Sequence, residues 1–279
     1  MAPVCICSLS LGLGSLLLKI HHSANLNKEK HKGLNMRTIS WFSCGAASAV
    51  ATKLALLEDP ETVVAYCEVI EEHPDNKRFL KECEEWFGVE VLVLRNEFYK
   101  GSIYNVFEKN YMRTPAGSPC TRALKKQVRE KFEQPGDRQV FGYTVEEENR
   151  VNRFIDANNE VDIWPVLIEK GLTKEDCLAI VQNAGIELPV LYKQGFHHNN
   201  CIMCVKGGMG YQNKMREHYP EEFKRMADLE KRKGYTVLKN PDGSPLYLHD
   251  LDPSAGNYPT EPNIECGIFC VMAEQDIKG

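Results

Sequence analysis

The chain has 279 residues, of which 43% are apolar and 26% are charged, and its formal net charge is −5. This length and apolar content are enough to bury a full core, so we expect one large domain or one domain with a smaller appendage. The acidic balance gives no overall sign of a nucleic-acid partner. Eleven cysteines are many for this length, but a secreted disulfide framework is not expected, because such frameworks belong to short, loop-rich chains and this chain has the pattern of a large α/β domain.

The first 35 residues differ from the rest. An apolar stretch rich in Ser and Gly (residues 4–20) precedes a polar run with several Lys and His (residues 21–35). The apolar part is too short and interrupted for a membrane span, and it lacks the features of a signal peptide. We therefore expect residues 1–35 to be a disordered tail or an overextended translation start, and the folded domain to begin at Met36. We predict a cytoplasmic protein without stable membrane association, a weak membrane anchor being the alternative.

Residues 39–50 begin with an apolar strand. The strand runs into a turn of small residues, 43–48, which opens a helix. Such a turn can direct backbone N–H groups, two hydroxyls and a helix dipole at one anion, for which phosphate is the natural ligand. An ordinary strand-to-helix loop is the alternative. The predicted phosphate-binding residues are Ser43, Cys44, Gly45, Ala46 and Ser48.

The next elements repeat strand and helix. Residues 61–69 predict a strand, residues 76–87 a helix capped by Asp75, and residues 89–94 an apolar strand buried on both faces. This rhythm predicts an α/β fold: a doubly wound, mostly parallel sheet with helices on both faces, covering residues 36–195. Because ligands bind at the carboxyl ends of such strands, the turn at 43–48 should share a crevice with residues 68–75, including Glu68.

A loop at residues 114–119 leads to Cys120 and then to a basic helix over residues 123–132. Most of its charges fit a solvated helix face, but Arg122 and Lys125 lie near its start, where they could reach an anion. A fourth strand over residues 139–144 leads to two further candidate cations, Arg150 and Arg153.

Residues 196–279 form a cysteine-bearing C-terminal extension that we expect to be helical. Cys201 and Cys204 are spaced Cys-x-x-Cys, which places two thiolates at one metal or cluster edge and also suits a redox dithiol. Cys266 and Cys270 follow near the end. Between the pairs, residues 220–233 predict an amphipathic helix packed on the sheet through Phe223, Met226 and Leu229.

The turn at 43–48 resembles the PP-loop of the adenine-nucleotide α-hydrolase superfamily, Ser-Gly-Gly-x-Asp-Ser. Ser43, Gly45 and Ser48 keep the frame, while Cys44 and Ala47 replace the second Gly and the Asp. In the superfamily that Asp helps to hold the magnesium used in ATP cleavage, so the resemblance gives no support for magnesium here.

Most of residues 36–270 resembles the phosphoadenosine phosphosulfate (PAPS) reductase-like branch of this superfamily. The similar segments are the modified PP-loop, residues 71–79 with 85–88, residues 120–125, and residues 219–223 with 265–268. The resemblance implies an adenine nucleotide as substrate and a [4Fe–4S] cluster held by Cys120, Cys201 and Cys204, with Cys266 or Cys270 as a possible fourth ligand. Two departures are Pro119 before Cys120, where the family has a tandem Cys-Cys, and Phe269 in place of a terminal His.

The first hypothesis is therefore a sulfonucleotide reductase. The phosphosulfate would lie on the PP-loop, with Arg122, Lys125, Arg150 or Arg153 neutralising its charge. Cys266 would attack the sulfur, and a thiol reductant such as thioredoxin, or Cys270 as resolving thiol, would complete the reduction.

Two alternatives remain open at this point. One is an iron–sulfur sulfurtransferase that uses ATP to modify tRNA, DNA or a small molecule. The other is a zinc-stabilised binding protein without catalysis, in which His197, His198, Cys201 and Cys204 hold the metal.

Overall fold

The structure is a computed structural model that describes residues 36–113 and 117–261. The described residues from Thr38 onward belong to one compact unit. The predicted tail before Met36 and both predicted thiols near the end, Cys266 and Cys270, lie outside the described residues.

Five parallel strands form the central sheet in the order β3-β2-β1-β4-β5. Their register places Ile39 beside Val63 on one side and beside Gln139 on the other. The strands are β1 (Thr38–Phe42), β2 (Val63–Cys67), β3 (Leu92–Leu94), β4 (Arg138–Val140) and β5 (Asp162–Trp164). The predicted parallel α/β sheet is confirmed.

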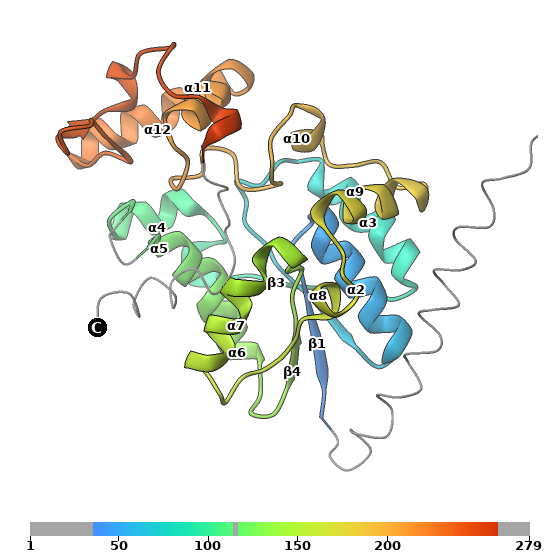
Figure 1. Cartoon of the computed structure of the whole chain (residues 1–279). Coiled ribbons are helices and arrows are strands. Elements are labelled where there is room, and N and C mark those ends of the chain that lie inside the picture. The colour runs from blue at the N-terminus through green and yellow to red at the C-terminus, as the bar shows by residue number, and fades with distance from the viewer. Residues whose placement is uncertain (1–35, 114–116, 262–279) are drawn as a thin grey trace, which may run out of the picture. The chain divides into compact units, whose positions relative to one another are not determined.

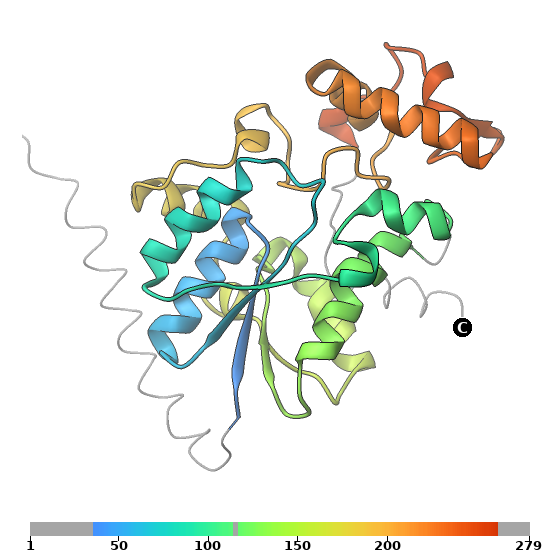
Figure 2. The same ribbon diagram turned by 180° about the vertical axis from the view of Figure 1, so that it is seen from behind.

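Helices cover both faces of the sheet, as Figures 1 and 2 show from opposite sides. One face carries α2 (Ala46–Glu58), α3 (Asn76–Phe87), α8 (Val166–Glu169) and α9 (Lys174–Asn183). The other carries α6 (Gln127–Phe132) and α7 (Glu148–Ala157). The winding reverses between β1 and β4, so the segments that leave their carboxyl ends diverge and open a crevice there.

The third strand differs from its prediction. It is shorter than expected, and Leu92 and Val93 are 43% and 50% exposed. β3 is the edge strand next to β2, so only one of its sides is paired and its side chains are not enclosed by neighbours.

Shorter elements connect the sheet to the C-terminal part. The predicted basic helix begins as a π-helical turn, η2 (Arg122–Lys126), before it continues as α6. π-Helical turns inside helices are frequent at functional sites. The remaining elements are η1 (Glu97–Tyr99), α4 (Ile103–Lys109), α5 (Pro119–Thr121), η3 (Val145–Glu147), α10 (Val190–Lys193), α11 (Met209–His218), α12 (Pro220–Lys233), β6 (Leu238–Lys239), β7 (Pro245–Leu246), η4 (Leu248–Asp250) and η5 (Tyr258–Thr260).

The helix α12 corrects a second expectation. Phe223, Met226 and Leu229 are buried as predicted, but the helix packs on α11 and η4 rather than on the sheet. One core surrounds the strands of the sheet and includes Ile39 and Ile163. The apolar face of α12 belongs to a second core, which also contains residues of α4 and of the Cys201–Cys204 segment. An amphipathic pattern identifies the buried face of a helix without identifying its partner.

Glu230 on α12 gives a prediction on stability. Its side chain is fully buried and accepts the N–H groups of Val237 and Leu248 at 2.6 and 2.7 Å. Burial raises its pKa from the ordinary 4.5 to about 7. Between these two pH values, Glu230 keeps its proton in the folded state and has released it in the unfolded state. Protonated Glu230 therefore contributes its full stabilisation below its ordinary pKa of 4.5. This contribution is lost as the pH rises from 4.5 to about 7, which lowers the free energy of unfolding by about 3 kcal/mol.

Glu230→Gln should remove this pH dependence, at a constant cost of about 1–3 kcal/mol for the lost acceptor. Urea unfolding of both proteins across this pH range measures the difference. An equal slope in the variant would contradict the assignment.

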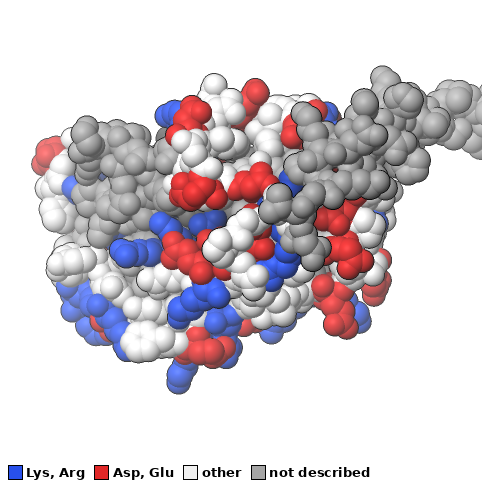
Figure 3. Space-filling model, turned by 90° about the horizontal axis from the view of Figure 1, so that it is seen from below, with Lys and Arg blue, Asp and Glu red and all other residues white. Residues whose placement is uncertain are grey.

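The surface carries both signs of charge. Figure 3 looks at the amino ends of the strands, where Lys and Arg are interspersed with Asp and Glu over the described part of that face. This agrees with the modest net charge of −5. Within the described ranges, every helix is too short or too polar to cross a membrane.

Candidate functional site

The loop between β1 and α2 is held together by its own serines. The Ser48 hydroxyl accepts hydrogen bonds from the Ser43 N–H and hydroxyl at 3.1 and 3.0 Å, and donates to the Gly45 carbonyl at 2.9 Å. Gly45 is the N-cap of α2, so the first N–H groups of a 13-residue helix lie beside this loop. The loop therefore offers backbone donors and a helix dipole to an anion.

Cys44 shapes the loop through its backbone, and its thiol lies in the protein interior. Its φ of 55° is in the left-handed region, and its side chain is fully buried, with Sγ 3.9 Å from the Asn76 carbonyl. Burial raises the pKa of the thiol well above its ordinary value. A neutral thiol packed beneath the loop is not suited to nucleophilic attack.

Gly142 lets the segment after β4 approach the loop. A Cβ atom at this position would lie 2.5 Å from the Ser48 nitrogen and 2.7 Å from its Cα. Because both are backbone atoms, only glycine fits without moving the start of α2. This residue was not among the predicted site residues, although a glycine at the end of a strand can signal a close backbone approach.

A cavity of about 180 Å³ opens above the carboxyl ends of β1, β2 and β4. Six predicted nucleotide-binding residues line it: Ser43, Gly45, Ala46, Ser48, Lys125 and Arg150. The structure adds residues that the sequence reasoning missed, among them Tyr66, Gly142, Tyr143, Lys174, Tyr192, His198 and Asn199.

Four predicted residues do not line this cavity. Cys44 lies beneath the loop, and the Glu68 carboxylate is 3.7 Å from Arg95. Arg122 is exposed, and Arg153, also exposed, donates to the Asn149 carbonyl at 3.2 Å. Their binding roles stay predictions.

Three cationic side chains line the cavity: Lys125, Arg150 and Lys174. Lys125 Nζ is 3.2 Å from the Glu72 carboxylate, and Arg150 donates to Glu147 at 3.1 Å. Lys174 donates to the His197 carbonyl, and burial lowers its pKa. Glu147 also lines the cavity, so the described lining keeps an excess of positive charge, which favours an anionic ligand.

Glu72 organises the floor of this region. Its carboxylate is 3% exposed and accepts hydrogen bonds from the Tyr66 hydroxyl at 2.6 Å and from the Asn76 amide at 3.1 Å, besides pairing with Lys125. The π-helical turn η2 carries Lys125 to this carboxylate.

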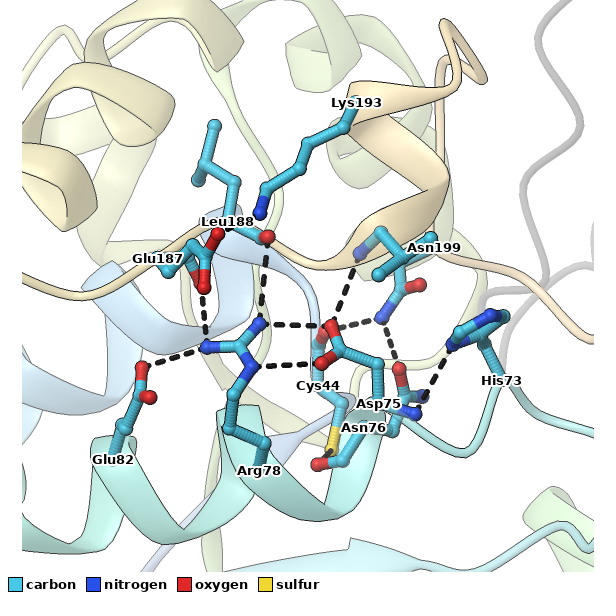
Figure 4. A network of polar contacts seen from close by, with 11 residues as sticks. Cys44, His73, Asp75, Asn76, Arg78, Glu82, Glu187, Leu188, Lys193 and Asn199 are labelled. Carbon is cyan, nitrogen blue, oxygen red and sulfur yellow. Dashed lines mark hydrogen bonds and ion pairs between the residues drawn. The ribbon is translucent and has the colours of Figure 1, made fainter.

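The segment before Cys201 is tied to the loop and to α3, as Figure 4 shows. The Asn199 side-chain amide donates to the Cys44 carbonyl at 2.6 Å and to Asn76 Oδ1 at 2.8 Å. Asp75 stands at the start of α3 as predicted, but its carboxylate does not cap the helix. It binds Arg78 at 2.7 and 2.8 Å and accepts the Val190 N–H, fastening α10 to α3.

The Cys201–Cys204 turn has a fixed backbone. Met203 has a φ of 59°. The Tyr211 hydroxyl donates to the Cys201 carbonyl at 3.1 Å and accepts the Cys204 N–H at 3.3 Å, and Gln212 donates to the Cys204 carbonyl at 2.9 Å. Both cysteines are buried in the second core, and Cys120 packs against the same core. The fold therefore brings the three predicted cluster cysteines to one apolar region.

Comparison with known proteins identifies the family. Residues 37–206 match the family model of the phosphoadenosine phosphosulfate reductase domain, which is more than half of the chain. The chain belongs to this family.

Two further proteins are similar to this PAPS reductase domain protein. An uncharacterized protein of Methanocaldococcus jannaschii is 25% identical over 217 residues, which are 74% of this chain and 51% of that protein. The chain thus spans about half the length of this curated relative. The solved U34-tRNA thiolase of Methanococcus maripaludis with its [4Fe–4S] cluster matches with a TM-score of 0.41 and 11% identity, covering 77% of this chain and 79% of that chain. Nothing about the reaction follows from a likeness at this level.

Two sets of metal ligands are predicted from the sequence, one for zinc and one for an iron–sulfur cluster. Within the described residues, no three His, Cys, Asp or Glu side chains are placed to hold a single metal ion. The His197 ring stacks on Tyr258, and His198 lines the cavity. The zinc set of His197, His198, Cys201 and Cys204 stays a prediction. The cluster ligands stay a prediction, because a cubane distributes its thiolates over four irons and further candidates lie outside the described residues.

Proposed function

We propose that the protein binds an adenine sulfonucleotide in the cavity above the PP-loop and reduces it by cysteine thiol chemistry. One observation carries the proposal: the modified PP-loop and three cationic side chains, Lys125, Arg150 and Lys174, line the same cavity at the point where the sheet reverses its winding. Family membership supports the nucleotide as the ligand class.

The cavity suits the phosphate end of the ligand. Its volume of about 180 Å³ is below the roughly 300–1,000 Å³ of pockets that enclose drug-sized ligands. The loop N–H groups bind phosphate oxygens, and Lys174 and Arg150, which line the same cavity, supply positive charge. Tyr143, whose ring centre is 5.5 Å from the Arg150 guanidinium, adds an aromatic side chain to the cavity lining that could contact the nucleoside.

The reductive step uses Cys266. Its thiolate attacks the sulfur of the phosphosulfate, the S–O bond to the nucleotide breaks, and the nucleotide leaves with the bonding electrons. An external dithiol of the thioredoxin class then attacks the Cys266 sulfur, and sulfite leaves with an electron pair. The second thiol of that dithiol resolves the mixed disulfide, so two thiols are oxidised for each sulfite formed.

Three cysteines are available for an iron–sulfur cluster. Cys201 and Cys204 are buried in an apolar core that also contains Ile202 and Met203, and Cys120 packs against the same core. This environment fits thiolate ligands of a cluster, with the fourth from Cys270 or from outside the chain. A cluster bound there would supply redox and electrostatic chemistry beside the nucleotide.

Sulfite formation tests the proposal. The full chain, purified without oxygen, is expected to release sulfite from PAPS or adenosine phosphosulfate in the presence of thioredoxin. Cys266→Ser should abolish release, whereas Cys177→Ser, a buried thiol on α9, should not. Pyrophosphate release from ATP without sulfite formation would overturn the reductase proposal in favour of the sulfurtransferase.

Lys174→Met should weaken nucleotide binding about 10-fold or more, because a charge-assisted hydrogen bond to phosphate is lost. Since burial lowers the Lys174 pKa, binding by the wild type should decline with rising pH sooner than an ordinary lysine would allow. Calorimetry over a pH series measures both effects. Lys224→Met serves as the control, because Lys224 forms an exposed ion pair with Asp228. Equal losses of nucleotide affinity in both variants would exclude Lys174 from the site.

A further inference from the structure

The side chain of Asn199 makes a direct contact between the PP-loop and the segment that carries Cys201 and Cys204. It is 8% exposed, and its amide donates to the Cys44 carbonyl at 2.6 Å and to Asn76 Oδ1 at 2.8 Å. Figure 4 shows this amide between the loop and the start of α3. A buried donor with two acceptors holds its partners in a defined geometry.

The hydrogen bond from Asn199 to the Cys44 carbonyl fixes the orientation of the whole Cys44–Gly45 peptide. A peptide unit is planar and trans, so the Cys44 carbonyl and the Gly45 N–H point in opposite directions. Holding the carbonyl therefore sets the direction of the Gly45 N–H, the amide that immediately precedes α2 and belongs to a residue lining the cavity. Within the described residues this N–H donates to no acceptor of the protein.

The loop needs such a restraint. Cys44 has a φ of 55°, a conformation unfavourable for any residue with a Cβ atom. Without an external contact, this peptide could rotate to relieve the conformation, and the Gly45 N–H would turn with it. Asn199 supplies the contact from 155 residues further along the chain.

The other end of the contact leads to the cysteines. Asn199 lies two residues before Cys201, and the Ile202 N–H donates to the Glu71 carbonyl at 2.8 Å. Glu71 adjoins Glu72, the carboxylate that pairs with Lys125. The Cys201–Cys204 turn is therefore connected to the phosphate loop through Asn199 and to the Glu72–Lys125 pair through residues 71–72.

We infer that Asn199 is a positioning residue that holds the Cys44–Gly45 peptide in the orientation required for phosphate binding and couples nucleotide binding to the state of the Cys201–Cys204 turn. This inference rests on the proposed nucleotide site. Coupling is reciprocal, so a nucleotide that changes the reactivity of the two thiols is itself bound differently when they are modified.

The first test is affinity. ATP and PAPS are titrated into the wild type, Asn199→Ala and Asn199→Asp, the last keeping the size of the side chain but removing the donor. Both variants should bind at least about 10-fold more weakly. The control is Asn213→Ala, because Asn213 is 7% exposed and likewise donates twice to carbonyls, of Asp252 and Ala255 at 2.8 Å each; it should bind within about twofold of wild type.

The second test measures coupling, and its first arm uses the wild type alone and so does not depend on the stability of a variant. Iodoacetamide labelling of Cys201 and Cys204, followed by mass spectrometry, should change about fivefold or more when nucleotide is bound to the wild type. In Asn199→Ala the change should be less than about twofold. Nucleotide binding that leaves wild-type labelling unchanged would overturn the inference alone, as would equal affinity losses in Asn199→Ala and Asn213→Ala. Failure of the wild type to bind either nucleotide would overturn the proposed function as well.

Discussion

Glu72→Ala is expected to lower the free energy of unfolding by about 3–5 kcal/mol, because a largely buried cation loses its carboxylate. Glu72 is 3% exposed and Lys125 is 13% exposed, at a separation of 3.2 Å. The Tyr66 hydroxyl and the Asn76 amide lose the same acceptor. Urea unfolding at neutral pH measures the effect.

Two further variants separate charge from hydrogen bonding. Glu72→Gln keeps an acceptor without the charge and should cost less than Glu72→Ala. Adding Lys125→Met to Glu72→Ala should recover part of the loss, because no buried charge then remains at this pair. A loss below about 1 kcal/mol for Glu72→Ala would show that this pair does not organise the site.

Gly142→Ala is expected to weaken nucleotide binding by about 100-fold or more, because the added methyl group displaces the PP-loop. The new Cβ atom would lie 2.5 to 2.8 Å from the backbone of Ser48 and Ala47. Backbone atoms cannot rotate away, so the end of β4 and the start of α2 must separate. Overpacking of this kind also costs about 1–3 kcal/mol of stability. Calorimetric titration with PAPS and thermal unfolding measure the two effects.

Gly243→Ala provides the matched control. Gly243 has a φ of 85° in the turn between β6 and β7, and a Cβ atom there would meet nothing within 4 Å. The substitution should lower stability through backbone strain and leave nucleotide affinity unchanged. If Gly142→Ala retained wild-type affinity, the loop could not be the phosphate site.

Local patterns predicted the sheet and one side of the site. The small-residue turn, Lys125 and Arg150 could be found because each follows a strand or opens a helix near the carboxyl edge of the sheet. Other residues depend on contacts that no local pattern records. Asn199 meets Cys44 across 155 residues, and Lys174 reaches the cavity only because α9 packs against α2.

The wrong expectation for β3 and the position of Arg153 away from the cavity have the same origin. The apolar run at Leu92 and Val93 looks the same at the edge of a sheet as at its centre, because the run carries no information on neighbouring strands. Arg150 and Arg153 are three residues apart on α7, but only Arg150 lines the cavity. A helical pattern gives the relative angle of two side chains and not the direction of the helix.

The most direct test of the account is a calorimetric titration of the full chain, purified without oxygen, with PAPS and with ATP. The account predicts saturable binding of one nucleotide per chain, competition by the second nucleotide, and weakening by salt as expected for contacts with Lys125, Arg150 and Lys174. A chain that binds neither nucleotide, or that binds them equally well after Gly142→Ala, would contradict the assignment of the PP-loop cavity as the nucleotide site.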